Sequence, residues 1–157
     1  MSDAALIWDA QAASADIALL DGDLTTEAGL NTAVIISLFS DRRAREDDVL
    51  PQADADRRGW WGDGASADGD EIGSRLWLLA REKRLPIVLA KAREYSAEAL
   101  AWLVRDGVAS EVEVETSATD QGWLAIAVFI TRPGGPRRQR FDYVWRGVAT
   151  SPQTGAA

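Results

Sequence analysis

Apolar residues recur at helical spacing in three stretches of the first two-thirds of the chain. They follow the three- to four-residue period of a helix near residues 31–43, 74–84 and 87–106. Asn31 and Ser74 stand where N-caps are typical, since a side-chain oxygen there can accept a backbone N–H of the first turn. The pattern therefore predicts three helices. The last stretch is either one helix or two helices that meet near its middle.

The period shortens to two after Gly107, which is a typical residue just beyond the end of a helix. Alternating apolar and polar residues indicate strands in this region. Strands are expected near 5–9, 16–24, 110–116, 122–131 and 139–146. The stretch 122–131 is apolar on both faces, which is typical of a central strand. The last three strands follow one another directly, which favours an antiparallel meander.

These elements predict an α+β fold, with about three helices packed on a small, mainly antiparallel sheet. The 157 residues suit one compact domain. We expect residues 1–149 to form that domain. Residues 150–157 are small and polar, and we expect them to be a disordered tail.

Residues 45–71 have no apolar period and are rich in Asp and Gly. Loops of this length are usually functional or disordered. The sequence DRRGWWGD, at 56–63, places two arginines beside two adjacent tryptophans. Neighbouring side chains of an extended segment point in opposite directions, so we expect one Trp ring inside the fold and one at an interface. Alternatively, Gly59 and Gly62 let the backbone turn, and both rings then cap the core.

Arginine and tryptophan are among the residues most enriched at the energetic centres of protein interfaces. The loop and the segment that leads into it carry both types close together. We therefore expect a partner-binding surface formed by Arg42, Arg43, Arg57, Arg58, Trp60 and Trp61.

The composition excludes several classes of site. The chain has no Cys and no His, which removes disulfides, Cys/His zinc sites, Cys nucleophiles and Ser-His-Asp triads. No phosphate- or dinucleotide-binding glycine motif follows a strand, so we expect no cofactor and no enzymatic activity. A net charge of −8 disfavours nucleic acid and anionic membranes as partners.

An enzymatic alternative rests on the acidic part of the same loop. A carboxylate- or metal-dependent hydrolase would use these side chains as metal ligands or as an acid–base pair. Their spacing does not match an EF-hand, and no pair of carboxylates stands out. The aspartates available for such a site are Asp47, Asp48, Asp54, Asp56, Asp63, Asp68 and Asp70.

The chain resembles the small phage tail proteins typified by gene product 46 of bacteriophage Mu. The resemblance runs from Asp16 to Val148 and rests on four ordered blocks: GLNTAVIISLFSDRRA, DRRGWWGD, GSRLWLL and EALAWLVRDGVASEVEVE. That family is similar in turn to the baseplate wedge proteins typified by gene product 25 of bacteriophage T4. The Glu-Pro-Arg signature of many T4-type relatives is absent here, and RDGVA (105–109) stands in its place.

The resemblance implies a structural role as a baseplate wedge subunit of a contractile phage tail or tail-like particle. Its partners would be larger wedge subunits, together with hub or spike and sheath proteins. It would be a monomer or weak oligomer alone. It would reside in the baseplate of the virion tail, and in the bacterial host cytoplasm during assembly. The Arg- and Trp-rich loop would then be an assembly surface, with arginines for carboxylates and Trp for a pocket.

Overall fold

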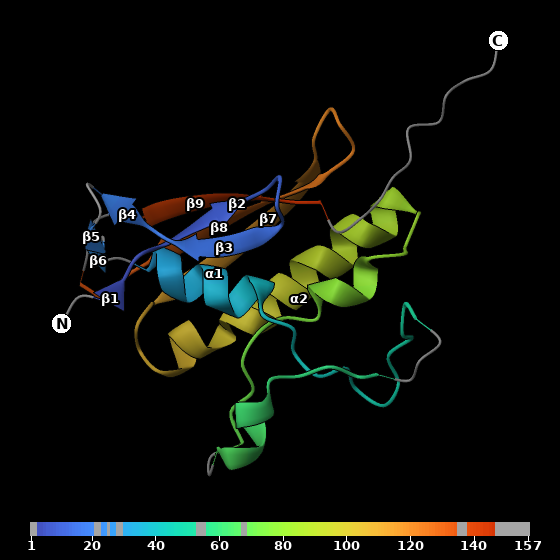
Figure 1. Cartoon of the computed structure of the whole chain (residues 1–157), viewed down its shortest axis with the longest axis horizontal. Helices are drawn as coiled ribbons and strands as arrows, with labels where there is room; N and C mark the ends of the chain where they lie inside the picture. Colours follow the sequence, from blue (N-terminus) through green and yellow to red (C-terminus); the bar gives the residue numbers. More distant parts are fainter. Residues whose placement is uncertain are drawn as a thin grey trace.

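The chain is built on a three-stranded antiparallel sheet (Figure 1). The computed structural model describes residues 3–20, 23–24, 26–27, 30–52, 56–66, 69–134 and 138–146. Strands β7 (Glu111–Ala118), β8 (Leu124–Thr131) and β9 (Arg138–Trp145) pair in that order. The meander predicted from the alternating period is confirmed, with small shifts at the strand ends.

Strand β8 lies at the centre of the sheet because its sequence suits burial on both faces. Every second residue from Leu124 to Ile130 is buried, and the residues between them are half-buried. Val128 lies opposite Val114 of β7 and Phe141 of β9. Branched and aromatic side chains placed opposite one another stabilise the pairing of neighbouring strands.

Two α-helices are present among the described residues: α1 (Asn31–Phe39) and α2 (Leu85–Arg105). The third predicted stretch is thus one helix, with a proline in its first turn, where the missing N–H costs no hydrogen bond. Gly107 has a φ of +75°, so the predicted helix end is confirmed. Both α-helices pack their apolar faces on the same side of the sheet.

The predicted helix at 74–84 is wrong, and a 3₁₀ turn, η2 (Leu76–Leu79), takes its place. An α-helix from Ser74 would need the Ser74 carbonyl to accept the Leu78 N–H. That carbonyl instead accepts the Arg42 N–H at 2.9 Å, and the Leu78 N–H donates to the Arg75 carbonyl at 3.0 Å. All four residues of η2 are buried, so the turn is surrounded by the core and has no solvent-exposed face.

Asn31 is not the N-cap of α1, because it is the first helical residue and Leu30 takes the N-cap position. Its side chain instead connects three elements. The amide nitrogen donates to the Leu6 carbonyl at 3.2 Å, and the amide oxygen accepts the Tyr143 hydroxyl at 2.6 Å. Asn31 therefore fixes the start of α1 against both the N-terminal strand and the sheet.

The N-terminal region forms hairpins in place of two longer strands. The prediction at 5–9 is confirmed by β2 (Leu6–Asp9), which pairs with β3 (Ser14–Ile17). A single strand over 16–24 is wrong, because β3 ends at Ile17 and the short strands at 19–20 and 23–24 pair antiparallel with each other. The other short strands are β1 (Asp3–Ala4), β4 (Leu19–Leu20), β5 (Asp23–Leu24) and β6 (Thr26–Glu27), and they pair as β1 with β6 and β4 with β5.

Trp8 fastens the β2–β3 hairpin to the body of the protein. Its ring stacks on Phe39 of α1 with ring centroids 3.7 Å apart. Its indole N–H donates to the Val144 carbonyl of β9 at 2.8 Å. The apolar face of the ring therefore packs on the helix, while its polar edge hydrogen-bonds to the backbone of the sheet.

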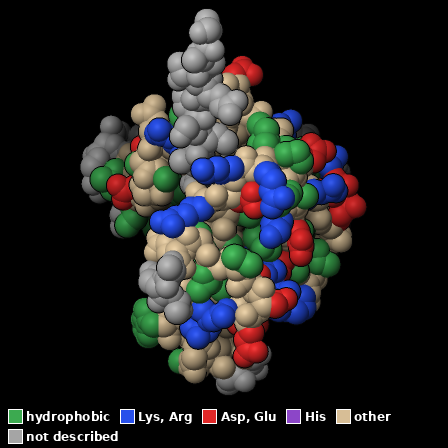
Figure 2. All heavy atoms as spheres, turned by 90° about the vertical axis from the view of Figure 1, so that its right-hand side faces the viewer, with side chains coloured by type: hydrophobic (Ala, Val, Ile, Leu, Met, Phe, Trp, Pro, Cys, Tyr) green, Lys and Arg blue, Asp and Glu red, His purple; other side chains and the backbone are tan. Residues whose placement is uncertain are grey.

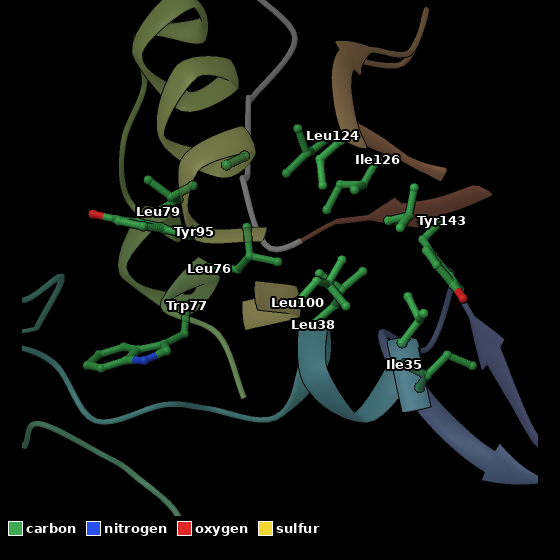
Figure 3. Close-up of a cluster of buried hydrophobic side chains, with 14 of the residues drawn as sticks. Ile35, Leu38, Leu76, Trp77, Leu79, Tyr95, Leu100, Leu124, Ile126 and Tyr143 are labelled. Atoms are coloured by element: carbon green, nitrogen blue, oxygen red, sulfur yellow. The ribbon is translucent and has the colours of Figure 1, made fainter. Parts of the chain in front are cut away.

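The molecule has the sheet and hairpins on one side of the helices and the segment after α1 on the other (Figure 1). Between them, Leu38 of α1, Leu100 of α2 and Leu76 of η2 point toward one another (Figure 3). Ile126 and Tyr143 close this core from the sheet. Because every layer contributes to one cluster, the α+β fold is a single domain.

The predicted tail, 150–157, lies outside the described residues, as does the end of the predicted domain at 147–149. Over the part of the chain that is described, neither α-helix is long and apolar enough to cross a membrane.

The core predicts a clear difference between two residues of α2. Leu100 is fully buried, whereas Val104 is about half-exposed on the same helix. Leu100→Ala should lower the free energy of unfolding by about 2–5 kcal/mol, because it leaves a cavity. Val104→Ala should change it by less than about 0.5 kcal/mol. Urea denaturation of both variants checks this, and equal losses would contradict the described core.

Candidate protein interface

The long segment between α1 and η2 is closed at its base by backbone bonds. Ser74 donates its N–H to the Ser40 carbonyl at 2.9 Å, and the Arg42 N–H donates to the Ser74 carbonyl at the same distance. Gly73 has a φ of +98°, and a Cβ there would clash with the Ser40 carbonyl oxygen. Only glycine therefore allows the two ends of the segment to approach this closely.

A buried arginine holds the first part of this segment against α2. Arg75 is only 4% exposed. It donates to Asp48 at 2.9 Å and to Glu98 of α2 at 2.8 Å, and it lies over the Tyr95 ring at 4.5 Å. Burial lowers the pKa of Arg75, but hydrogen bonds and charge attraction from Glu98 and Asp48 outweigh this effect and raise the pKa above its ordinary value.

Glu98 also receives two further arginines. Arg42 lies 3.6 Å from its carboxylate, and Arg45 forms a shorter ion pair with it. Arg42 reaches Glu71 as well, at 3.2 Å, and its side chain is largely buried. Arg42, one of the predicted partner-binding residues, is thus already engaged within the chain.

Two more of the predicted arginines shape the turn that precedes the tryptophans. Arg57 donates to the backbone carbonyls of Arg45 and Glu46. Arg58 pairs with Asp41 at 2.7 Å and lies over the Trp77 ring at 4.5 Å. Arg58 also has a φ of +51°, which costs a non-glycine residue about 1–3 kcal/mol. Backbone strain of this kind is common at functional sites.

Arg43 is the most available of the four arginines. It is exposed, and its only hydrogen bond to a described residue is a long one of 3.4 Å to the Arg58 carbonyl. No ion pair joins it to any carboxylate within the described ranges. Its Cβ sits beside Gly59, whose φ of +106° continues the tight turn begun at Arg58.

Both tryptophans of the pair are exposed, so the prediction of one ring inside the fold is wrong. Trp60 is 45% exposed and Trp61 is 87% exposed. The physical reason is that Trp77 already fills the space beneath the turn. Its ring is buried, and its indole N–H donates to the Arg42 carbonyl at 2.8 Å.

The tight turn at Arg58 and Gly59 leaves Trp61 exposed to solvent. The Trp60 ring lies directly on Gly62, where any Cβ would clash with it, and the two Trp rings are 5.3 Å apart. The 3₁₀ helix η1 (Trp61–Ala65) begins at Trp61 itself. Asp63 accepts the Ile72 N–H at 3.1 Å and so fixes η1 to the returning chain. Trp60 therefore packs against the turn, and Trp61 beside it points into solvent.

Among the described residues, no group of three acidic side chains is arranged to hold a metal ion. Asp48 is engaged by Arg75, and Asp63 is engaged by the Ile72 N–H. Asp54 and Asp68 lie outside the described residues. The structure therefore lends no support to the hydrolase alternative.

The comparisons with known proteins agree on one family. The sequence profile of a family described as "Phage protein GP46" matches residues 30–137. The chain is 47% identical over 135 residues to "Baseplate protein gp46" of Escherichia phage Mu, which covers 86% of this chain and 90% of that protein. It is 39% identical over 140 residues to "Mu-like prophage FluMu protein gp46" of Haemophilus influenzae, which covers 89% and 94%. The matched region contains all six predicted interface residues.

Gly73 gives a first test of how the segment is closed. Gly73→Ala should destabilise the protein by about 1–3 kcal/mol or more, because both the positive φ and the Ser40 carbonyl oppose a side chain. Gly64 is the matched control, since no neighbouring atom lies within 4 Å of a Cβ built there. Gly64→Ala should change stability by less than about 1 kcal/mol. Thermal melting of both variants decides, and equal melting temperatures would contradict the close approach at Gly73.

Arg75 gives a second test. Arg75→Ala should lower stability by about 3 kcal/mol, because it leaves the partly buried carboxylates of Asp48 and Glu98 without the arginine between them. For a chain of this size that corresponds to a melting temperature about 6–12 °C lower. Arg43→Ala removes an exposed arginine nearby and should change stability by less than about 0.5 kcal/mol. If both variants melt alike, Arg75 does not hold the segment.

Proposed function

This chain belongs to the family described as Phage protein GP46, and from this premise we propose that it is a structural subunit of the baseplate of a Mu-like phage or prophage tail. The support is the name of the phage Mu relative, "Baseplate protein gp46", whose match covers most of both chains. A baseplate subunit acts through its contacts with other proteins. Its surface is therefore expected to carry groups that only a partner can cover.

The finer role that we propose is that of a wedge subunit in a contractile tail or tail-like particle. The subunit would join larger wedge subunits to the hub or spike and to the sheath. It has no enzymatic activity in this proposal and is a monomer or weak oligomer alone. It would be assembled in the bacterial host cytoplasm and would end in the virion tail baseplate.

Trp61 is the observation that carries the interface proposal. An indole ring exposed at 87% on a strained, glycine-dependent turn is hardly buried within the chain, and its one ring contact among the described residues is Trp60. Burying such a ring against a partner removes a large apolar surface from water, and Trp residues often dominate interface energetics. We therefore propose that Trp61, Trp60 and Arg43 contact a partner directly.

The other three arginines have a supporting role in this proposal. Arg42, Arg57 and Arg58 are engaged by carboxylates, carbonyls or the Trp77 ring of the same chain. They hold the turn in the shape that presents Trp61, and their charge lies near the contact. A partner that fits this surface has a pocket for an indole ring and carboxylates at its edge.

Replacing Trp61 tests the proposal without disturbing the fold. Trp61→Ala should leave the melting temperature unchanged, because the ring makes few contacts within the chain. It should weaken binding to the other baseplate proteins about tenfold or more, since hot-spot residues contribute about 2 kcal/mol or more. The measurement is co-purification and titration with baseplate proteins expressed from the same tail gene cluster.

The matched control is Ile7→Ala, which removes a side chain 61% exposed on the β2–β3 hairpin, away from the turn (Figure 1). Unaltered binding by Ile7→Ala and reduced binding by Trp61→Ala would support the proposed surface. Full binding by Trp61→Ala would remove the turn from the interface while leaving the family assignment in place.

A further inference from the structure

A second surface lies beside the Arg75 network, on the other side of Asp48. A groove of about 320 Å³ runs between residues 47–51, the turn η2 and the first half of α2. Leu78, Leu79 and Tyr95 contribute its buried apolar lining.

The outer wall of the groove is apolar and open. Val49 is 87% exposed, and Leu50 and Pro51 follow it along the wall. The Val49 side chain is too exposed to stabilise the fold by burial. The groove therefore offers an apolar strip that a second chain can cover.

The groove is lined by three acidic and two basic residues, and those that form no ion pair with a described residue are Arg81, Lys91 and Asp47, a balance of one positive charge in a chain that carries −8 as a whole. Arg81 and Lys91 line it, and neither forms an ion pair with any residue that the structure describes. Two of the three acidic residues at the groove are already engaged. Asp48 pairs with Arg75, and Glu82 accepts the Arg84 N–H at 3.0 Å.

Figure 2 faces the side of the molecule that holds the start of α2 and shows basic side chains spread across it, with hydrophobic and acidic ones among them. Because the rest of the protein is acidic, an anionic ligand is attracted only where such cations gather. Because the lining is partly apolar, a ligand that fits the groove also needs apolar side chains. An extended peptide that alternates carboxylates and bulky apolar side chains meets both requirements.

We propose that this groove binds an extended acidic segment of a partner protein. An apolar side chain of that segment lies against Val49 and Leu50, and a neighbouring carboxylate lies between Arg81 and Lys91. The site shares no residue with the Trp61 turn, so it does not depend on the function proposed for that turn.

A synthetic peptide of alternating Asp and Leu is the probe. Titrated into the ¹⁵N-labelled full-length protein, it should shift the backbone amides of residues 47–49, 78–82 and 91. A peptide of alternating Asp and Ser keeps the charge and lacks the apolar side chains. It should bind at least about tenfold more weakly, since apolar burial supplies much of the binding free energy.

Charge reversal in the groove is the decisive comparison. Arg81→Glu with Lys91→Glu should weaken the Asp–Leu peptide about tenfold or more, because carboxylates then meet like charges. The control, Lys83→Glu with Arg93→Glu, makes the same change in net charge at exposed residues that do not line the groove. It should alter the affinity less than about threefold, through long-range charge alone.

The reversed groove should in turn accept a peptide of alternating Lys and Leu, which shows that the variant is folded and that its charges face the ligand. Equal weakening by the two double variants would overturn the proposal, because net charge alone would then explain binding. Amide shifts elsewhere on the protein, or equal binding of the Asp–Ser peptide, would also overturn it.

Discussion

The buried guanidinium of Arg75 is the interaction on which the shape of this protein depends. Arg75 comes directly before the buried turn η2, and it pairs with Asp48 from the long segment and with Glu98 from α2. Three parts of the chain that are distant in sequence are thereby held at one point. A buried charge is tolerated here because both carboxylates and the Tyr95 ring replace the water that Arg75 loses.

The rest of the segment follows from this anchor and from the bonds at its base. Asp48 is fixed on one side and Ser74 on the other, and the described part of the segment lies on the opposite side of the helices from the sheet (Figure 1). The turn forms at Arg58 and Gly59, both with positive φ. The strain at Arg58 is offset by its ion pair with Asp41 and by its position over Trp77. The outward direction of Trp61 is thus a consequence of the fold.

Patterns of local sequence predicted the regular elements well. The alternating period found the three strands of the sheet, and the helical period found α1 and α2. The helix predicted at 74–84 failed because its period was ambiguous. A run of four apolar residues suits an amphipathic helix and a fully buried turn equally, and only the bond between Ser74 and Arg42 decides between them.

The candidate interface could be located from the sequence, but the sequence did not show which of its arginines are engaged within the chain and which are free for a partner. DRRGWWGD marks the turn by composition alone. Which arginines are engaged depends on carboxylates that lie far along the chain, as Asp41 does from Arg58 and Glu98 from Arg42. The pairing of Arg75 with Asp48 and Glu98 was missed for the same reason. The one local signal was an arginine placed directly against the apolar run of η2, where a charge needs partners.

Seven tryptophans in one small chain make the distinction between core and surface clearest. Trp8 and Trp77 each bury most of the ring and direct the indole N–H to a backbone carbonyl, so both ends of the side chain are satisfied within the protein. Trp60 and Trp61 differ from them in being held on a turn whose conformation is set before any partner arrives. Because the cost of ordering that turn is met during folding, it does not reduce the affinity for a partner. The strained turn leaves an indole ring in water, and in the assembly role that we propose a partner covers that ring.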